Sequence, residues 1–126
     1  MEWLALLAGC VLLLVGVLGL VPGATTRYGE LRFAGEGSHA QLFGVFRVSI
    51  LLNLVHVLGG LAGIALSRTS RGALAFLVSA GVASLGLWLV GVAAAGSWIP
   101  LEAADNWLHF GVGLALLGLA RAARQP

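Results

Sequence analysis

Charged side chains are scarce in this 126-residue sequence, at 10% of the chain. An ordinary soluble domain carries about a quarter charged residues, so this content argues against one. The basic residues are arginines, and they form neither a basic run nor a basic helical stripe. Nucleic-acid-binding proteins display such runs or stripes. We therefore expect no nucleic-acid partner.

Cysteine occurs once, as Cys10, within the first apolar segment. A single cysteine excludes a disulfide framework within the chain and a metal site built from several thiolates. The N-terminus also lacks the basic start of a signal peptide. Its apolar run from Trp3 to Val21 is longer than the roughly 7–15 residues of a signal-peptide core. We expect this run to be a transmembrane helix.

Hydrophobic residues, in contrast, make up 60% of the chain. They predict four helices of about 20 residues, the length that crosses a bilayer, over residues 3–21, 43–67, 72–95 and 99–120. Helices that are apolar on all sides need lipid around them, because so short a chain cannot bury them in a core of its own. The sequence predicts an all-α membrane protein, a four-transmembrane-helix antiparallel bundle forming one domain over residues 1–126.

The positions of the arginines predict the orientation of this bundle. Arg68 and Arg71 lie between the second and third segments, and Arg121 and Arg124 follow the fourth. The positive-inside rule then places both termini in the cytoplasm, in a multi-pass protein of the bacterial cytoplasmic membrane. Residues 24–42 form the one long connection, on the outer side. Its alternating large apolar side chains predict a short structured cap.

A repeated motif supplies the main polar residues of the apolar segments. Asn53-Leu54-Val55-His56 returns as Asn106-Trp107-Leu108-His109, and the same offset of 53 positions aligns further glycines and arginines. A repeat of this kind is consistent with the tandem duplication of a helix hairpin. The first copy would then carry a loop of about 19 extra residues, a length that functional or partner-binding loops often have.

Helical spacing places these polar residues on matching faces of the second and fourth segments. Each histidine precedes an arginine by 12 residues, which is about 18 Å of helix and close to the middle of the bilayer. Polar groups at that depth must face inward. The sequence therefore predicts a buried polar centre, whose members are Asn53, His56, Asp105, Asn106 and His109.

Three interpretations of this centre remain open. The side chains can form a polar clamp, hydrogen-bonded between helices, that fixes the register of the bundle. His56 and His109 can instead be ligands of a haem iron or of another metal, with Asp105 as a further ligand. A proton path through Glu102, Asp105 and His109 is the third interpretation, but no acid continues it to the cytoplasmic side. We expect no bound cofactor under the first interpretation, and haem is the alternative.

Two further groups of residues have structural roles in this prediction. Arg47, at the outer start of the second segment, is expected to form an interface ion pair with Glu102 or Asp105. Glycines allow the close backbone approach by which helices pack in lipid. The glycines expected at helix contacts are Gly59, Gly60, Gly63 and Gly113.

Two blocks of sequence carry a family resemblance. PGATTRYGELRFAGEGSHAQLFGVFRVSILLNLVHVLGGLAG and the later IPLEAADNWLHFGVG resemble the bacterial membrane family called domain of unknown function 4383. The resemblance covers nearly the whole chain. It implies a four-helix integral membrane protein with the Asn-x-x-His blocks as family features, and it implies no activity. Members often carry His where this chain has Leu52 and Asn where it has Glu102, which weakens a multi-histidine metal centre here.

Together these features predict a small membrane protein without catalytic activity, because the sequence offers no nucleophile–base pair, carboxylate dyad or phosphate-binding loop. We expect a structural or accessory subunit in contact with the lipid bilayer and with a larger membrane complex or a second copy of the chain. A haem- or metal-binding membrane protein that uses His56 and His109 is the alternative.

Overall fold

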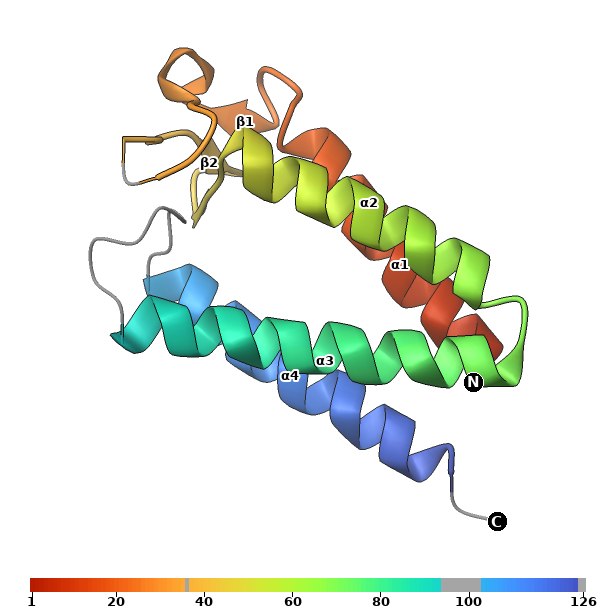
Figure 1. Ribbon diagram of the computed structural model, residues 1–126. Coiled ribbons are helices and arrows are strands. Elements are labelled where there is room, and N and C mark those ends of the chain that lie inside the picture. Colours follow the sequence, from red (N-terminus) through yellow and green to blue (C-terminus); the bar gives the residue numbers. More distant parts are fainter. Residues whose placement is uncertain (36, 94–102, 125–126) are drawn as a thin grey trace.

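The computed structural model describes residues 1–35, 37–93 and 103–124, and it contains four helices in this part of the chain. They are α1 (Glu2–Leu18), α2 (Ile50–Leu66), α3 (Ser70–Ala93) and α4 (Ala103–Ala122). α1 packs chiefly against α2, and α3 packs chiefly against α4, so that the molecule consists of two helix hairpins (Figure 1). The predicted all-α fold with four helices is confirmed.

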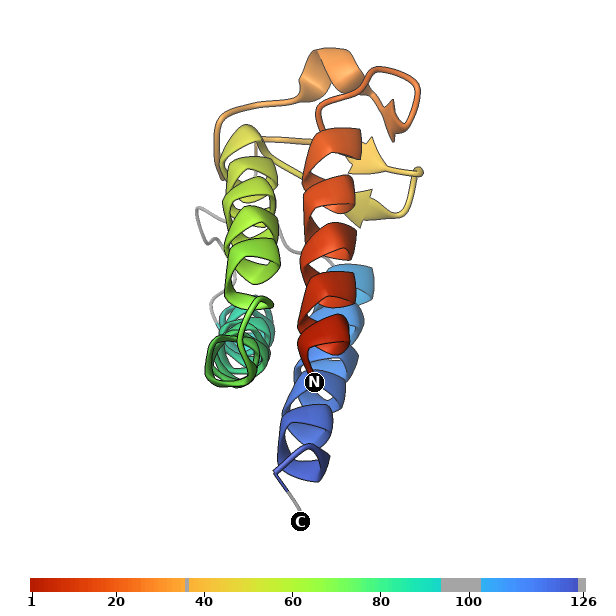
Figure 2. The same cartoon turned by 90° about the vertical axis from the view of Figure 1, so that its right-hand side faces the viewer.

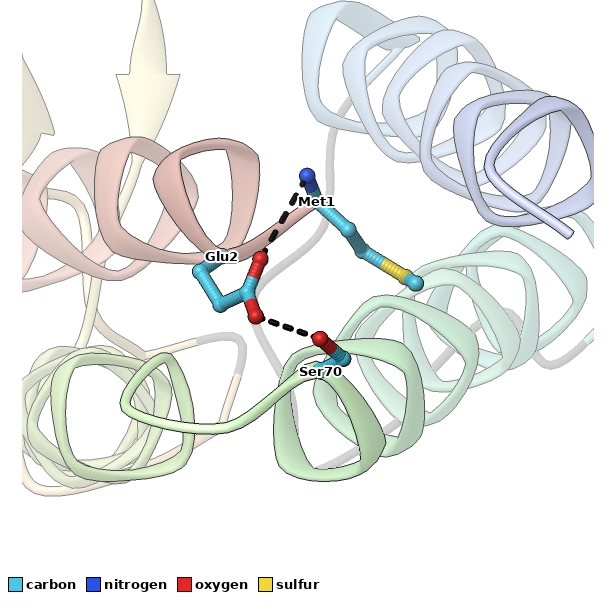
Figure 3. A network of polar contacts seen from close by, with 3 residues as sticks. All are labelled: Met1, Glu2 and Ser70. Carbon is cyan, nitrogen blue, oxygen red and sulfur yellow. Dashed lines mark hydrogen bonds and ion pairs between the residues drawn. The ribbon is translucent and has the colours of Figure 1, made fainter.

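The two hairpins meet at the end of the molecule that holds the N-terminus and the connection from α2 to α3 (Figures 1 and 2). A core cluster lies there, with Ala5 of α1, Ala120 of α4 and three residues of α3, which are Ala73, Phe76 and Leu77. Small alanines let the helices approach closely. A polar contact adds to this junction, since the Ser70 hydroxyl donates to the carboxylate of Glu2, which also lies near the N-terminal ammonium group (Figure 3).

The start of α2 differs from the sequence-based prediction. The helix begins at Ile50 rather than near Phe43, because the Ser49 hydroxyl caps it by accepting a hydrogen bond from the Leu52 N–H at 3.1 Å. Of the apolar residues before Ser49, Phe46 belongs to a β-strand, and Phe43 and Val45 lie in the turn before it. α1 ends at Leu18, earlier than predicted, whereas the predicted end of α3 at residue 95 and the predicted helix start at residue 99 lie outside the described residues.

The connection between α1 and α2 forms a small cap at the outer end of the first hairpin (Figure 1). It contains a short 3-10 helix, η1 (Tyr28–Glu30), and an antiparallel sheet in the order β1-β2-β3. The strands are β1 (Thr25–Thr26), β2 (Gln41–Leu42) and β3 (Phe46–Arg47). Ala40, Leu42 and Val48 form a separate core under this cap. The connection is therefore ordered, as expected, with a sheet as its centre.

α3 is the helix of this structure that is long and apolar enough to cross a membrane. It has 24 residues, whereas α1 and α2 are apolar but have 17 residues each. A bilayer crossing needs about 20. By length and composition, one of the described helices therefore meets the criterion for a membrane span.

Candidate functional site

Asn53, in the first turn of α2, is fully buried in the first hairpin, with an exposed fraction of 0%. The residue lies on α2, and its amide packs against Gly19 at the end of α1. A Cβ atom at position 19 would overlap the amide group of Asn53. Glycine is therefore required at this position if Asn53 is to keep its place between the two helices.

The second hairpin repeats the arrangement. Asn106 of α4 packs against Gly91 of α3, and a Cβ atom at position 91 would overlap the Asn106 amide. Gly91 lies 72 positions after Gly19, whereas Asn106 lies 53 positions after Asn53. Each hairpin thus holds an asparagine amide against the backbone of its first helix.

A second pair of close contacts lies further along each hairpin. Gly60 of α2 approaches the backbone of Gly9 on α1, and Gly113 of α4 approaches that of Gly81 on α3. Gly81 also lies 72 positions after Gly9. These contacts allow the helix axes to come close together.

The expected packing glycines differ in what surrounds them. Gly63 packs against the ring of Phe76 and against Gly9, and Gly60 and Gly113 occupy the contacts just described. Gly59 has only the Leu12 side chain near its Cβ position, at 3.8 Å, which is an ordinary contact. Three of the four glycines therefore lie where a larger side chain would displace a neighbour.

The two histidines come from different hairpins. His109 of α4 is buried, and His56 of α2 is half-buried. The Ser84 hydroxyl of α3 donates to the main-chain carbonyl of His109 at 3.0 Å, which fixes the backbone of α4 at this level.

Several buried polar atoms of this centre have no hydrogen-bond partner. They are Oδ1 and Nδ2 of Asn53, Oδ1 of Asn106 and the Nδ1 atoms of His56 and His109. Each such atom costs about 1–3 kcal/mol when it is removed from water without a partner. The predicted hydrogen-bonded clamp is therefore absent at Asn53, which the helices hold by shape through Gly19 and not by hydrogen bonds.

Two of the three residues expected in the interface ion pair, Arg47 and Asp105, lie in the described part of the chain. Asp105 is buried near the start of α4, and β3, which carries Arg47, packs against this helix. Both side chains take part in polar interactions. Glu102, the other expected partner, lies outside the described residues.

A metal centre has weak support in this arrangement. Within residues 1–35, 37–93 and 103–124, no group of three or more His, Cys, Asp or Glu side chains lies close enough together to hold a metal ion. Zinc sites normally have at least three protein ligands. His56 and His109 alone would have to supply the protein ligands of any metal bound at this centre.

The sequence pattern did not predict that Gly19 and Gly91 pack against the asparagine amides. Gly19 and Gly91 lie on the first helix of each hairpin, and the offset of 53 positions does not align them. They align only at an offset of 72 positions, once the 19 extra residues of the first connection are taken into account. The correspondence of Gly19 with Gly91 is therefore present in the sequence, but it is found only when the two halves of the chain are aligned with a gap.

The fold and its centre define a class of protein: a pair of glycine-packed helix hairpins with a buried layer of asparagine and histidine. Residues 2–122 match the family model described as Domain of unknown function (DUF4383), and the chain belongs to this family. Among the curated proteins and among the solved structures, nothing matches the chain. The resemblance found in the two sequence blocks is confirmed.

Proposed function

We propose that this chain is an integral membrane protein in which all four helices cross the bilayer. The observation that carries the proposal is the distribution of side chains between surface and interior. Large apolar residues of every helix are exposed, including Leu14 at 57%, Leu58 at 66%, Val82 at 59% and Leu114 at 51%. Side chains arranged in this way need an apolar solvent, because exposed apolar surface of this extent is rare in soluble monomers.

The interior supports the same proposal. Its helix contacts include many small residues, glycine, alanine and serine, beside Phe76 and Leu77, and its buried polar side chains include asparagine and histidine. This is the pattern of helices that pack in lipid, where small residues allow close approach and polar residues face inward.

The shorter helices fit a bilayer with modest adjustment. A helix of 17 residues such as α1 is about 25 Å long, against about 30 Å for the hydrocarbon core. The backbone of α1 continues through a tighter turn, in which the Val21 N–H donates to the Leu18 carbonyl at 3.1 Å. Local thinning of the bilayer accommodates the remaining mismatch.

The role that we propose is structural or accessory, without catalysis. The interior is filled by helix contacts, and the outer cap presents apolar side chains at its surface, Phe33 at 60% and Phe43 at 62% exposed. Such residues suit a contact with a larger membrane protein or with a second copy of the chain. The matching contacts at offsets of 53 and 72 positions support an origin by hairpin duplication.

Alkaline carbonate extraction tests the membrane proposal. We expect the chain to stay in the membrane pellet at high pH and to be released only by detergent. Release by carbonate alone would overturn the proposal. Purification in mild detergent then tests the accessory role, since a strictly monomeric particle without a partner would contradict it.

A second candidate function is haem or metal binding by His56 and His109. The observation that favours it is that both imidazoles have a buried Nδ1 atom without a hydrogen-bond partner. It ranks second because histidines that ligate metals usually have the other ring nitrogen oriented by a hydrogen bond. The absorbance spectrum and metal content of the purified protein test it. A Soret band or bound metal that is lost in His109→Ala and kept in His39→Ala, a change at an exposed cap residue, would replace the first proposal by this one.

A further inference from the structure

Four arginines gather at the end of the molecule where the two hairpins meet. All of their side chains are exposed, and they are Arg68, Arg71, Arg121 and Arg124. Arg71 lies two residues before Ala73, and Arg121 directly follows Ala120. Because Ala73 and Ala120 belong to the same core cluster, Arg71 of α3 and Arg121 of α4 lie at the same end of the second hairpin, next to the connection that carries Arg68.

These four arginines have no counter-charge within the described residues. No side-chain hydrogen bond or ion pair joins any of them to another described residue. Among the described acids, Glu2 is the one at this end, and its carboxylate is already engaged by the Ser70 hydroxyl and the N-terminal ammonium group (Figure 3). This end of the molecule therefore carries four positive charges without a counter-charge among the described residues.

Two of the three arginines at the cap, Arg32 and Arg47, are in a different situation. The guanidinium group of Arg32 donates hydrogen bonds to the carbonyls of Gly29 and Leu31, at 3.0 and 3.1 Å. Arg47 also takes part in a polar interaction. The unpartnered positive charge is thus concentrated at the junction end.

We propose that this end binds the headgroup of an anionic phospholipid, whose phosphate joins Arg71 of α3 and Arg121 of α4. A guanidinium group matches a phosphate through two parallel hydrogen bonds, which makes arginine well suited to this contact. Basic residues beside a membrane span also attract anionic lipids. The proposal rests on the membrane location proposed above.

Apolar side chains beside the arginines account for the rest of the lipid. Trp3 at the start of α1 is 66% exposed, Leu66 at the end of α2 is 41% exposed, and Leu119 near the end of α4 is 40% exposed. These exposed apolar side chains lie at the same end of the molecule as the arginines, so acyl chains could contact them while the headgroup contacts the arginines. A free phosphate ion would contact the arginines but not these apolar side chains.

The consequence is a lipid that stabilises the packing of α4 against α3 at this end. The two helices meet in the core cluster through Ala73 and Ala120, and the repulsion between Arg71 and Arg121 opposes that contact. A bound phosphate removes the repulsion and bridges the two sides.

Thermal unfolding of the full chain in lipid nanodiscs tests the proposal. Phosphatidylglycerol added to phosphatidylcholine nanodiscs is expected to raise the melting temperature by about 5 °C. The double variant Arg71→Gln and Arg121→Gln should lose this shift. The matched control, Arg27→Gln and Arg32→Gln, removes the same charge from the cap and should keep it.

Each other outcome of this experiment counts against the proposal. An equal shift in both double variants, or no shift in the wild-type chain, would overturn it. An equal stabilisation by inorganic phosphate or by polyglutamate would show that any anion suffices, which would overturn the assignment to a lipid. A chain that enters nanodiscs but ignores phosphatidylglycerol leaves the membrane proposal standing, whereas failure to enter them contradicts that proposal instead.

Discussion

At the scale of single residues, each hairpin contains an asparagine whose amide packs against a glycine of the neighbouring helix. Gly19 and Gly91 supply space for Asn53 and Asn106, and the Asn53 amide receives no hydrogen bond in return. The close packing of Asn53 against Gly19, and not a hydrogen bond, therefore fixes how α1 and α2 are aligned along each other. The unpartnered atoms of this amide lower stability, which natural proteins tolerate mainly where a residue has a further use.

The seating of Asn106 gives the first prediction. Gly91→Ala should destabilise the protein by about 1–3 kcal/mol, because the new methyl group overlaps the Asn106 amide. Gly86 provides the control on the same helix, since its Cβ position has no neighbour within 4 Å. Gly86→Ala should be neutral or slightly stabilising, as alanine favours helix. Thermal unfolding in detergent compares the stabilities of the two variants. Equal changes in melting temperature would contradict the packing of Gly91 against Asn106.

The unpartnered amide of Asn53 gives the second prediction. Asn53→Leu should raise the free energy of unfolding by about 1–3 kcal/mol, because it replaces two buried atoms without partners by apolar ones. Asn53→Ala should lower it, since it leaves a cavity beside Gly19. A decrease in stability for both variants would mean that the amide has a hydrogen-bond partner in the membrane.

At the scale of elements, apolar runs predict the helices but not every boundary. The run around Phe43 looks like the start of a helix, yet it forms a turn and two strands. Phe43 and Gly44 have φ angles of 53° and 71°, the left-handed region that ends regular helix. The pairing of β2 with β1, which is distant in sequence, stabilises this turn. Local apolar character alone does not predict such a contact.

The cap gives the third prediction. The Ser38 hydroxyl donates to the Val48 carbonyl at 2.6 Å and accepts from the Arg32 N–H at 3.1 Å. Ser38→Ala leaves both main-chain groups unpaired in a buried site and should cost about 1–3 kcal/mol of local stability. Hydrogen exchange of the cap amides should become faster, while exchange in α3 stays unchanged. His39→Ala, at an exposed neighbour, is the control, and equal exchange in both variants would count against this role.

At the scale of the whole molecule, the two hairpins share one plan, and the sequence predicts its outline. The four helices, the Asn-x-x-His motif and the arginines at one end are all visible in the residue pattern. What the pattern does not show is how the polar residues are divided. The asparagines pack against glycines within each hairpin, whereas His56 and His109 belong to different hairpins. Which glycine meets each asparagine depends on how the paired helices pack, which no local pattern encodes.

The central claim is that the exposed helix faces meet lipid, and cysteine accessibility in intact spheroplasts tests it most directly. In a Cys10→Ser background, a membrane-impermeant maleimide should label Gly37→Cys in the cap at once. It should label Ala122→Cys at the end of α4 only after permeabilisation. Leu58→Cys, at a helix position that is 66% exposed, should stay unlabelled until detergent replaces the lipid. Rapid labelling of Leu58→Cys in intact membranes would show that this face meets water and would contradict the account.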